Sequence, residues 1–203
     1  HVVRCFVDEN ISHVEESIDP IRDIELIETE LLLADLVTIE KSISRLDKLS
    51  RSDKKIASNL ELVKKLKIFC DEGNPARNFS CNSSELGFIK SMFLLTSKPI
   101  MYIANINEDE LVSDSLGKFS SLLFTKFEGE ETEVIELCGK VEQEISTLNK
   151  NEQLEFLAEY NLDEPGLNIL IRKAFNLLNL ETYFTGGDSE VRAWTIKKGS
   201  SAP

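Results

Sequence analysis

Two short polar segments each follow a run of apolar and β-branched residues. Asn105-Ile106-Asn107-Glu108 follows the run 98–105, and Cys138-Gly139-Lys140 follows the run 133–138. An amide and a carboxylate can hydrogen-bond the edge of a purine base, and small residues let backbone amides approach it closely. In an open parallel sheet, ligands bind beyond the carboxyl ends of the strands. The two segments therefore indicate a site for the base of a nucleotide.

The residues that we expect to line this base site are Asn105, Ile106, Glu108, Cys138 and Gly139. Each segment alone is also typical of an ordinary feature, a capped turn for Asn-x-x-Glu and a strand-to-helix turn with a buried thiol for Cys-Gly. Their placement after consecutive strands favours the base site. The second segment would contribute its backbone, because the Lys140 side chain can equally be solvated.

The segments resemble the base-recognition motifs of the P-loop G proteins, which use Asn-Lys-x-Asp at one strand end and a small-residue loop at the next. Here the Lys is replaced by Ile106 and the Asp by the longer Glu108. Adenine lacks the two donors that guanine offers to a carboxylate, so a displaced carboxylate weakens a preference for guanine. Backbone groups around Ile106 could then bond adenine, and we expect ATP to be accepted at least as well as GTP.

The elements that must position these segments alternate between strands and helices. We expect strands over 1–7, 98–105 and 133–138, a hairpin over 181–196, and helices over 21–49, 54–71, 82–93, 113–125, 141–146, 150–160 and 164–178. Alternating strands and helices predict an α/β fold with a parallel sheet.

Two long helices are expected between the first two strands. The apolar residues of the first recur at spacings of four and three, a heptad pattern: Leu32, Leu36, Ile39, Ile43 and Leu46. The second has a shorter apolar stripe: Ile56, Leu60 and Val63. A polar turn near 50–53 joins them, which predicts an antiparallel helical hairpin inserted into the α/β domain.

The charge of this helical hairpin is uneven. From Lys41 to Lys67 there are nine basic residues and three acidic ones, whereas from Glu15 to Glu40 there are nine acids and one base. A solvated two-helix surface accounts for this pattern. A basic tip that contacts an RNA backbone accounts for it as well. We hypothesise that the tip binds RNA, with three first candidates: Arg51, Lys54 and Lys55.

Composition is typical of a folded protein of the reducing cytosol. A hydrophobic content of 41% allows a core, and a net charge of −13 argues against nucleic-acid or membrane binding by the average surface. The four cysteines and two histidines show no metal-ligand or redox spacing, which predicts free thiols and no metal site. No apolar stretch reaches membrane-spanning length, so we expect no membrane partner.

Six strings, in order along essentially the whole chain, closely resemble the YchF/Obg-like ATPase family: Ile21-Arg22-Asp23-Ile24-Glu25, Thr29-Glu30-Leu31, Ala34-Asp35-Leu36, Met101-Tyr102-Ile103-Ala104-Asn105, Glu164-Pro165-Gly166-Leu167-Asn168 and Glu190-Val191-Arg192-Ala193-Trp194-Thr195. The resemblance implies a ribosome-binding ATPase with relaxed discrimination against GTP, so the RNA expected at the hairpin tip would be ribosomal RNA. By position, Asn105, Ile106 and Glu108 match the family's Asn-x-x-Glu base motif, and Cys138-Gly139-Lys140 falls on its following base loop.

The resemblance also implies a domain organisation. A P-loop G domain would occupy 1–19 and, as its base-binding half, 98–180, with an inserted antiparallel coiled coil over 20–97. The start of a TGS domain, of β-grasp type, would occupy 181–203. No Gly-x-x-x-x-Gly-Lys-Ser/Thr string occurs in the sequence, so the phosphate-binding loop and the Mg²⁺ ligands would precede His1.

Neither end of the chain resembles a natural terminus, and we expect an internal fragment that hydrolyses nothing alone and binds nucleotide poorly. The full-length protein would use ATP or GTP with Mg²⁺, as a cytoplasmic monomer. Two other functions stay open. One is a non-catalytic module that binds ribosomes, RNA or protein through the basic helical hairpin, and the other is a different Obg-related GTPase. A P-loop lysine upstream of His1 would favour the hydrolase. A strong preference for GTP would favour the other Obg-related GTPase, and Glu108 argues against such a preference.

Overall fold

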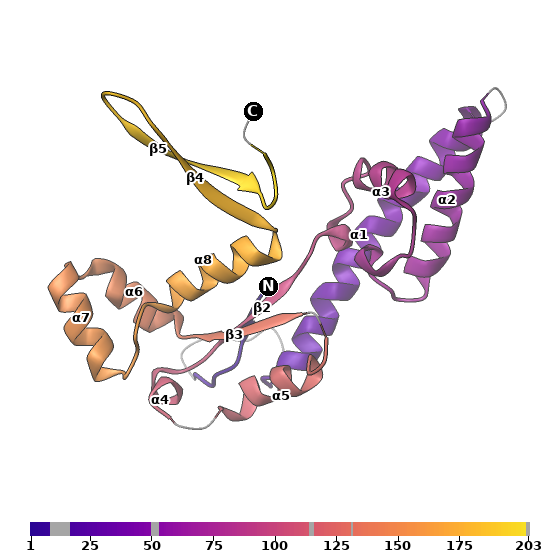
Figure 1. Cartoon of the computed structure of the whole chain (residues 1–203). Helices are drawn as coiled ribbons and strands as arrows, with labels where there is room; N and C mark the ends of the chain where they lie inside the picture. Colours follow the sequence, from indigo (N-terminus) through magenta and orange to yellow (C-terminus); the bar gives the residue numbers. More distant parts are fainter. Residues whose placement is uncertain (9–16, 50–52, 114–115, 131, 202–203) are drawn as a thin grey trace. The chain divides into compact units, whose positions relative to one another are not determined.

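A computed structural model describes residues 1–8, 17–49, 53–113, 116–130 and 132–201 of the chain. The chain divides into two compact units, the first formed by His1–Ile21 with Ile100–Pro203 and the second by Arg22–Pro99. Figure 1 shows the first unit with the strands and the second with the two long helices. The domain names expected from the sequence stay predictions.

A three-stranded parallel sheet lies at the centre of the first unit. Its strands are β1 (Val2–Arg4), β2 (Met101–Asn105) and β3 (Glu133–Leu137), in the order β1-β2-β3. All neighbouring strands are parallel, and Ile103 of β2 pairs with Val2 on one side and Ile135 on the other. The prediction of an α/β fold with a parallel sheet is confirmed.

The first strand is shorter than the predicted run 1–7. Its ladder ends where Cys5 donates its N–H to the carbonyl of Asn105, the last residue of β2, at 2.8 Å. Beyond that point the Arg4 guanidinium donates to the carbonyls of Phe6 and Asp8, both at 3.1 Å. The apolar run continues in the sequence, but its carbonyls are satisfied by a side chain instead of by a neighbouring strand.

Five helices of the first unit follow the strands: α4 (Glu108–Leu111), α5 (Lys118–Lys126), α6 (Gly139–Thr147), α7 (Lys150–Glu159) and α8 (Gly166–Leu177). The helix predicted over 113–125 corresponds to α5 but begins later than expected, only after Gly117, and the short α4 precedes the predicted range. Gly117 has an extended backbone (φ −60°, ψ 157°) and acts as the N-cap of α5. The break therefore lies at a residue that favours helix ends over helix interiors.

A contact from α6 fixes the beginning of α8. The Glu142 carboxylate, in the first turn of α6, accepts the N–H groups of Gly166 at 2.7 Å and Leu167 at 3.0 Å. These amides belong to the first turn of α8, where no intrahelical acceptor exists for them. The carboxylate supplies that acceptor and a charge that suits the positive end of the helix dipole.

The last described element is the hairpin of β4 (Leu180–Gly186) and β5 (Val191–Lys197), in which Tyr183 pairs with Trp194. Its side chains are mostly exposed on both faces. The predicted hairpin is present, and its assignment to a TGS domain stays a prediction.

The second unit is built on α1 (Pro20–Leu49) and α2 (Lys54–Asp71), which run in opposite directions side by side (Figure 1). Pro20 occupies the first turn of α1, where its missing N–H costs nothing, and the Asp53 side chain caps α2 by accepting the Lys55 N–H at 2.8 Å. The heptad positions of α1 face the shared core, which contains Ile39, Leu46, Leu60, Val63 and Leu66.

Three short helices complete the second unit: α3 (Ser83–Lys90) and the 3-10 helices η1 (Ala76–Asn78) and η2 (Leu95–Ser97). A buried polar network connects η1 and η2 to α1. Asp35 is 2% exposed, and its carboxylate accepts the N–H of Leu95 at 2.6 Å and both the N–H and hydroxyl of Thr96 at 2.7 Å. The Thr96 hydroxyl oxygen in turn accepts the Ala76 N–H at 2.9 Å.

Each partner in this network is satisfied, which a buried carboxylate requires.

No helix within the described ranges is long and apolar enough to cross a membrane.

Candidate functional site

The carboxyl ends of all three parallel strands open onto one pocket of about 450 Å³. Its lining comes from the segments that directly follow β1, β2 and β3: Phe6, Asp8, Asn105, Ile106, Asn107, Glu108, Asp109, Cys138 and Lys140. Four of the five predicted site residues are among them. The fifth, Gly139, is hydrogen-bonded to Asn105, so the parallel topology brings the whole predicted set together.

The contact between Asn105 and Gly139 connects two strand ends. The Gly139 N–H donates to Asn105 Oδ1 at 3.0 Å, and the neighbouring Ile106 N–H donates to the Leu137 carbonyl at 3.0 Å. A Cβ at Gly139 would lie 3.4 Å from Asn105 Oδ1, an ordinary contact. Space alone therefore does not require glycine here. The bond fixes the Asn105 side chain and leaves its amide NH₂ as the donor end.

The side chains of Ile106 and Cys138 are unavailable to a ligand. Each residue is 3% exposed, so both side chains belong to the core below the pocket. The Ile106 N–H donates to the Leu137 carbonyl and the Cys138 carbonyl accepts the Glu142 N–H, both at 3.0 Å, so a contribution of backbone groups to the pocket stays a prediction. Buried side chains at these positions hold the adjacent backbone in place, which suits a site that recognises a flat base through main-chain groups.

The carboxylate of Glu108 accepts two hydrogen bonds at the pocket edge. Lys140 Nζ lies 2.6 Å from Oε2, and the Tyr160 hydroxyl donates to Oε1. The hydrogen bond from Lys140, and then the one from Tyr160, lower the pKa of Glu108. The same contact with Glu108 raises the pKa of Lys140. The Lys140 side chain is 68% exposed, but it is an ion-pair partner as well as a solvated lysine.

Sequence reasoning missed Tyr160 and the segment after β1. Tyr160 is 52 residues from Glu108 and caps the end of α7, so no local pattern connects the two. Phe6 and Asp8 could have been found by applying the strand-end rule to the first strand too. The Arg4 guanidinium lies 4.9 Å from the Phe6 ring centroid and shapes this segment.

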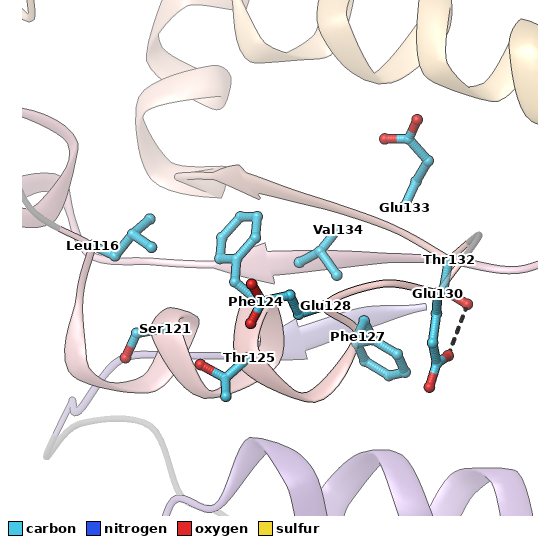
Figure 2. A pocket seen from close by; sticks show the side chains of 10 residues that line it. All are labelled: Leu116, Ser121, Phe124, Thr125, Phe127, Glu128, Glu130, Thr132, Glu133 and Val134. Atoms are coloured by element: carbon cyan, nitrogen blue, oxygen red, sulfur yellow. Dashed lines mark hydrogen bonds between the residues drawn. The ribbon is translucent and has the colours of Figure 1, made fainter.

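A second cavity, of about 690 Å³, lies between α5 and β3 in the same unit. Figure 2 shows that its lining residues come from Leu116 before α5, from α5 itself, from the turn that follows and from the beginning of β3. Three are glutamates, Glu128, Glu130 and Glu133, and the described lining includes no lysine or arginine. This negative lining suits a phosphate group poorly. The smaller pocket at the strand ends is therefore the candidate nucleotide site, despite its size.

The basic residues of the helical hairpin are also exposed. Lys54 and Lys55 lie on the surface in the first turn of α2, whereas the third RNA candidate, Arg51, lies outside the described residues. On α1, Lys41, Arg45 and Lys48 are exposed and line a shallow groove together with Val37 and Leu49. Sequence reasoning had counted these α1 residues in the basic stretch but had not selected them.

The fold and the pocket define an α/β protein whose candidate ligand site lies at the carboxyl edge of an open parallel sheet. The chain is 45% identical over 204 residues to a Bacillus subtilis protein named ribosome-binding ATPase YchF, with 100% of this chain and 56% of that protein covered. It is 42% identical over 204 residues to a protein of the same name from Escherichia coli O157:H7, covering 100% and 55%.

A solved structure described as the YchF GTPase of Schizosaccharomyces pombe matches with a TM-score of 0.85 and 30% identity, covering 99% of this chain and 55% of that one. No family model matches the chain. The resemblance to the YchF/Obg-like ATPases is confirmed: the chain is a homologue of these proteins along its whole length. It spans about half the length of the curated relatives that it matches.

Proposed function

We propose that the full-length protein is a nucleotide hydrolase that uses ATP, discriminates weakly against GTP and acts at the ribosome. The observation that supports this most strongly is the pocket at the three strand ends, in a chain whose relatives are named ribosome-binding ATPases. At about 450 Å³ the pocket is within the usual range of small-molecule sites. In this proposal it holds the base, and the phosphates lie beyond it.

The roles of the pocket residues follow from their contacts. Asn105, fixed by the Gly139 N–H, would offer its amide donors to the base. The Ile106 carbonyl and the Cys138 N–H would complete the base edge, since the Ile106 N–H and the Cys138 carbonyl are already bonded to Leu137 and Glu142. The described residues contain no group of three or more side chains suited to hold a metal ion. In this proposal the Mg²⁺ accompanies the phosphates and is held with them by the phosphate-binding loop, where it would neutralise charge that develops during phosphoryl transfer.

The finer domain assignments belong to the same proposal. The α1–α2 pair would be the inserted coiled coil, within 20–97, because its heptad positions face a shared core. The β4–β5 hairpin would begin a TGS domain over 181–203. A cytoplasmic monomer fits a homologue of proteins named for ribosome binding, and these residues alone would lack hydrolytic activity.

Nucleotide binding by the full-length natural protein tests this function. We expect ATP and GTP to bind with dissociation constants within about tenfold of each other, and Asn105→Ala to weaken both by roughly tenfold, since a buried hydrogen bond contributes about 1–1.5 kcal/mol. Asn151→Ala removes the same side chain from an exposed position on α7 and should change neither. Titration calorimetry that detects neither nucleotide with the unmodified protein would contradict the proposal.

Ribosome or RNA contact through the helical hairpin is a second candidate function. It is favoured by the exposed basic residues of α1 and α2, in a chain whose net charge is −13. Replacement of Arg51, Lys54 and Lys55 by glutamate should weaken cosedimentation with ribosomes and flatten its salt dependence. The matched control replaces Lys118, Lys150 and Lys197, three exposed lysines outside the helical hairpin, by glutamate. Equal binding by the two triple variants would remove the hairpin tip from the proposal.

A further inference from the structure

The Glu108 carboxylate has both of its oxygens engaged by donors from its own chain. Oε2 lies 2.6 Å from Lys140 Nζ, and Oε1 accepts the Tyr160 hydroxyl hydrogen. The donors come from different elements, since Lys140 is in the first turn of α6 and Tyr160 is the C-cap of α7. Glu108 and Lys140 line the pocket, whereas Tyr160 lies outside its lining.

Tyr160 is well placed to keep donating this bond. Its ring lies against Phe156, with ring centroids 5.0 Å apart, which fixes the direction of the hydroxyl. The bond to Glu108 raises the pKa of Tyr160 to about 12, so the phenol keeps its proton at neutral pH. Because the pKa of Glu108 is lowered, the acceptor is ionised under the same conditions. The contact is therefore a charge-assisted hydrogen bond, one of the stronger kinds.

This arrangement bears on how the pocket distinguishes bases. A carboxylate favours guanine by accepting its ring N–H and exocyclic amino hydrogens, whereas adenine presents an acceptor at the matching ring position. At Glu108 both oxygens already accept from Lys140 and Tyr160, and the lysine neutralises the negative charge. Guanine must compete with two intramolecular donors for this carboxylate, and adenine loses nothing when the carboxylate is occupied.

We propose that Lys140 and Tyr160 are specificity-determining residues that hold the Glu108 carboxylate away from guanine and so let the pocket accept adenine. The inference rests on the proposed nucleotide-binding function and deepens it. Tyr160 is a positioning residue, because it acts through Glu108 and does not line the pocket. The length of the Glu108 side chain is then only part of the cause of weak guanine preference, and the engagement of its carboxylate is the other part.

The test measures dissociation constants for ATP and GTP, with Mg²⁺, on the full-length natural protein. The double variant Lys140→Met, Tyr160→Phe frees the carboxylate and keeps the aromatic ring. We expect the affinity for GTP relative to ATP to rise by on the order of tenfold, the discrimination that one good bidentate contact provides. Adding Glu108→Gln to this double variant should abolish the gain, because the gain comes from the freed carboxylate.

The matched control is Lys150→Met with Tyr183→Phe, which removes the same groups from positions outside the pocket and should leave the ratio unchanged. An unchanged ratio of GTP affinity to ATP affinity in the Lys140, Tyr160 variant overturns the inference, whether or not both affinities fall together. If that variant does not fold by circular dichroism, Tyr160→Phe alone decides, with a rise of roughly threefold expected and no change overturning the inference. Failure of the unmodified protein to bind either nucleotide would instead overturn the proposed function, and the inference with it.

Discussion

Asp35 in the second unit and Glu108 in the first are carboxylates with opposite surroundings. Asp35 is 2% exposed and accepts three hydrogen bonds from two consecutive residues, Leu95 and Thr96. The Glu108 side chain is 35% exposed and accepts from two side chains on separate helices. If the Asp35 carboxylate is removed or turned away, buried donors are left unpaired. The Glu108 arrangement can be opened, because water or a ligand can replace each partner.

The contrast separates a carboxylate that holds a fold together from one that can change partners at a site. Burial decides which role a carboxylate has, since an unpaired buried donor is costly and an exposed one is not. The variants below test that division, from the largest expected effect to the smallest.

Asp35→Ala should cause the largest loss. It leaves the buried N–H of Thr96 and the half-buried N–H of Leu95 without their acceptor, which we expect to cost about 3 kcal/mol of the free energy of unfolding. Urea denaturation monitored by circular dichroism measures the loss, and hydrogen exchange at the two amides localises it. Glu61→Ala, at an exposed position on α2, is the control. Comparable losses in the two variants would show that burial does not distinguish Asp35.

Thr96→Val removes one hydroxyl from the same network and keeps the shape of the side chain. The Ala76 N–H loses its acceptor and the Asp35 carboxylate loses one of three donors, so we expect a loss of about 1–2 kcal/mol in the free energy of unfolding. Thr29→Val, where the hydroxyl is exposed and donates to the Glu25 carbonyl within α1, should lose much less. A neutral Thr96→Val would argue that water replaces the hydroxyl.

Glu142→Ala tests a carboxylate of intermediate exposure. Two amides in the first turn of α8 lose their acceptor, and we expect a loss of about 1 kcal/mol, as for an N-cap. Faster hydrogen exchange at Gly166 and Leu167 would locate the effect. Glu144→Ala, two residues along α6, removes an equal charge as the control. Unchanged exchange at both amides in Glu142→Ala would exclude the capping role.

The Tyr160–Glu108 contact should be detectable as a shifted titration of the Tyr160 phenol. The folded-state pKa of Tyr160 is raised to about 12 from a reference of 10.0, so the contact favours folding fully below pH 10 and is lost as the pH rises toward 12. Ultraviolet absorbance of the phenolate should include a late transition that belongs to Tyr160. Tyr160→Phe should remove that transition and Glu108→Gln should move it to lower pH, whereas Tyr183→Phe should leave it in place.

At acidic pH the same contact should be lost through protonation of Glu108. Because the folded-state pKa of Glu108 is lowered, its contacts contribute above the unfolded-state value near 4.5 and are lost as the pH falls through the folded-state value.

Local patterns predicted much of this structure. The heptad of α1 required a partner stripe, and α2 provides it at Leu60 and Val63. The polar residues after β2 and β3 converge because parallel strands end at one edge. The contacts of Asp35 and Glu108 could not be predicted, since their partners are 61 and 52 residues away and reach them through the packing of connecting segments. No periodicity or spacing encodes such a pair, and an acidic residue on a helix is usually solvated.

The edge position of β1 has a consequence for handling this polypeptide. Among the described residues β1 is a terminal strand of the sheet and pairs with β2, and Val2 at its beginning is 62% exposed. Within the described residues no strand lies on its outer side, and a strand edge of this kind can pair with another extended segment. We therefore expect these residues in isolation to self-associate along β1 as their concentration is raised, at temperatures below those that unfold them.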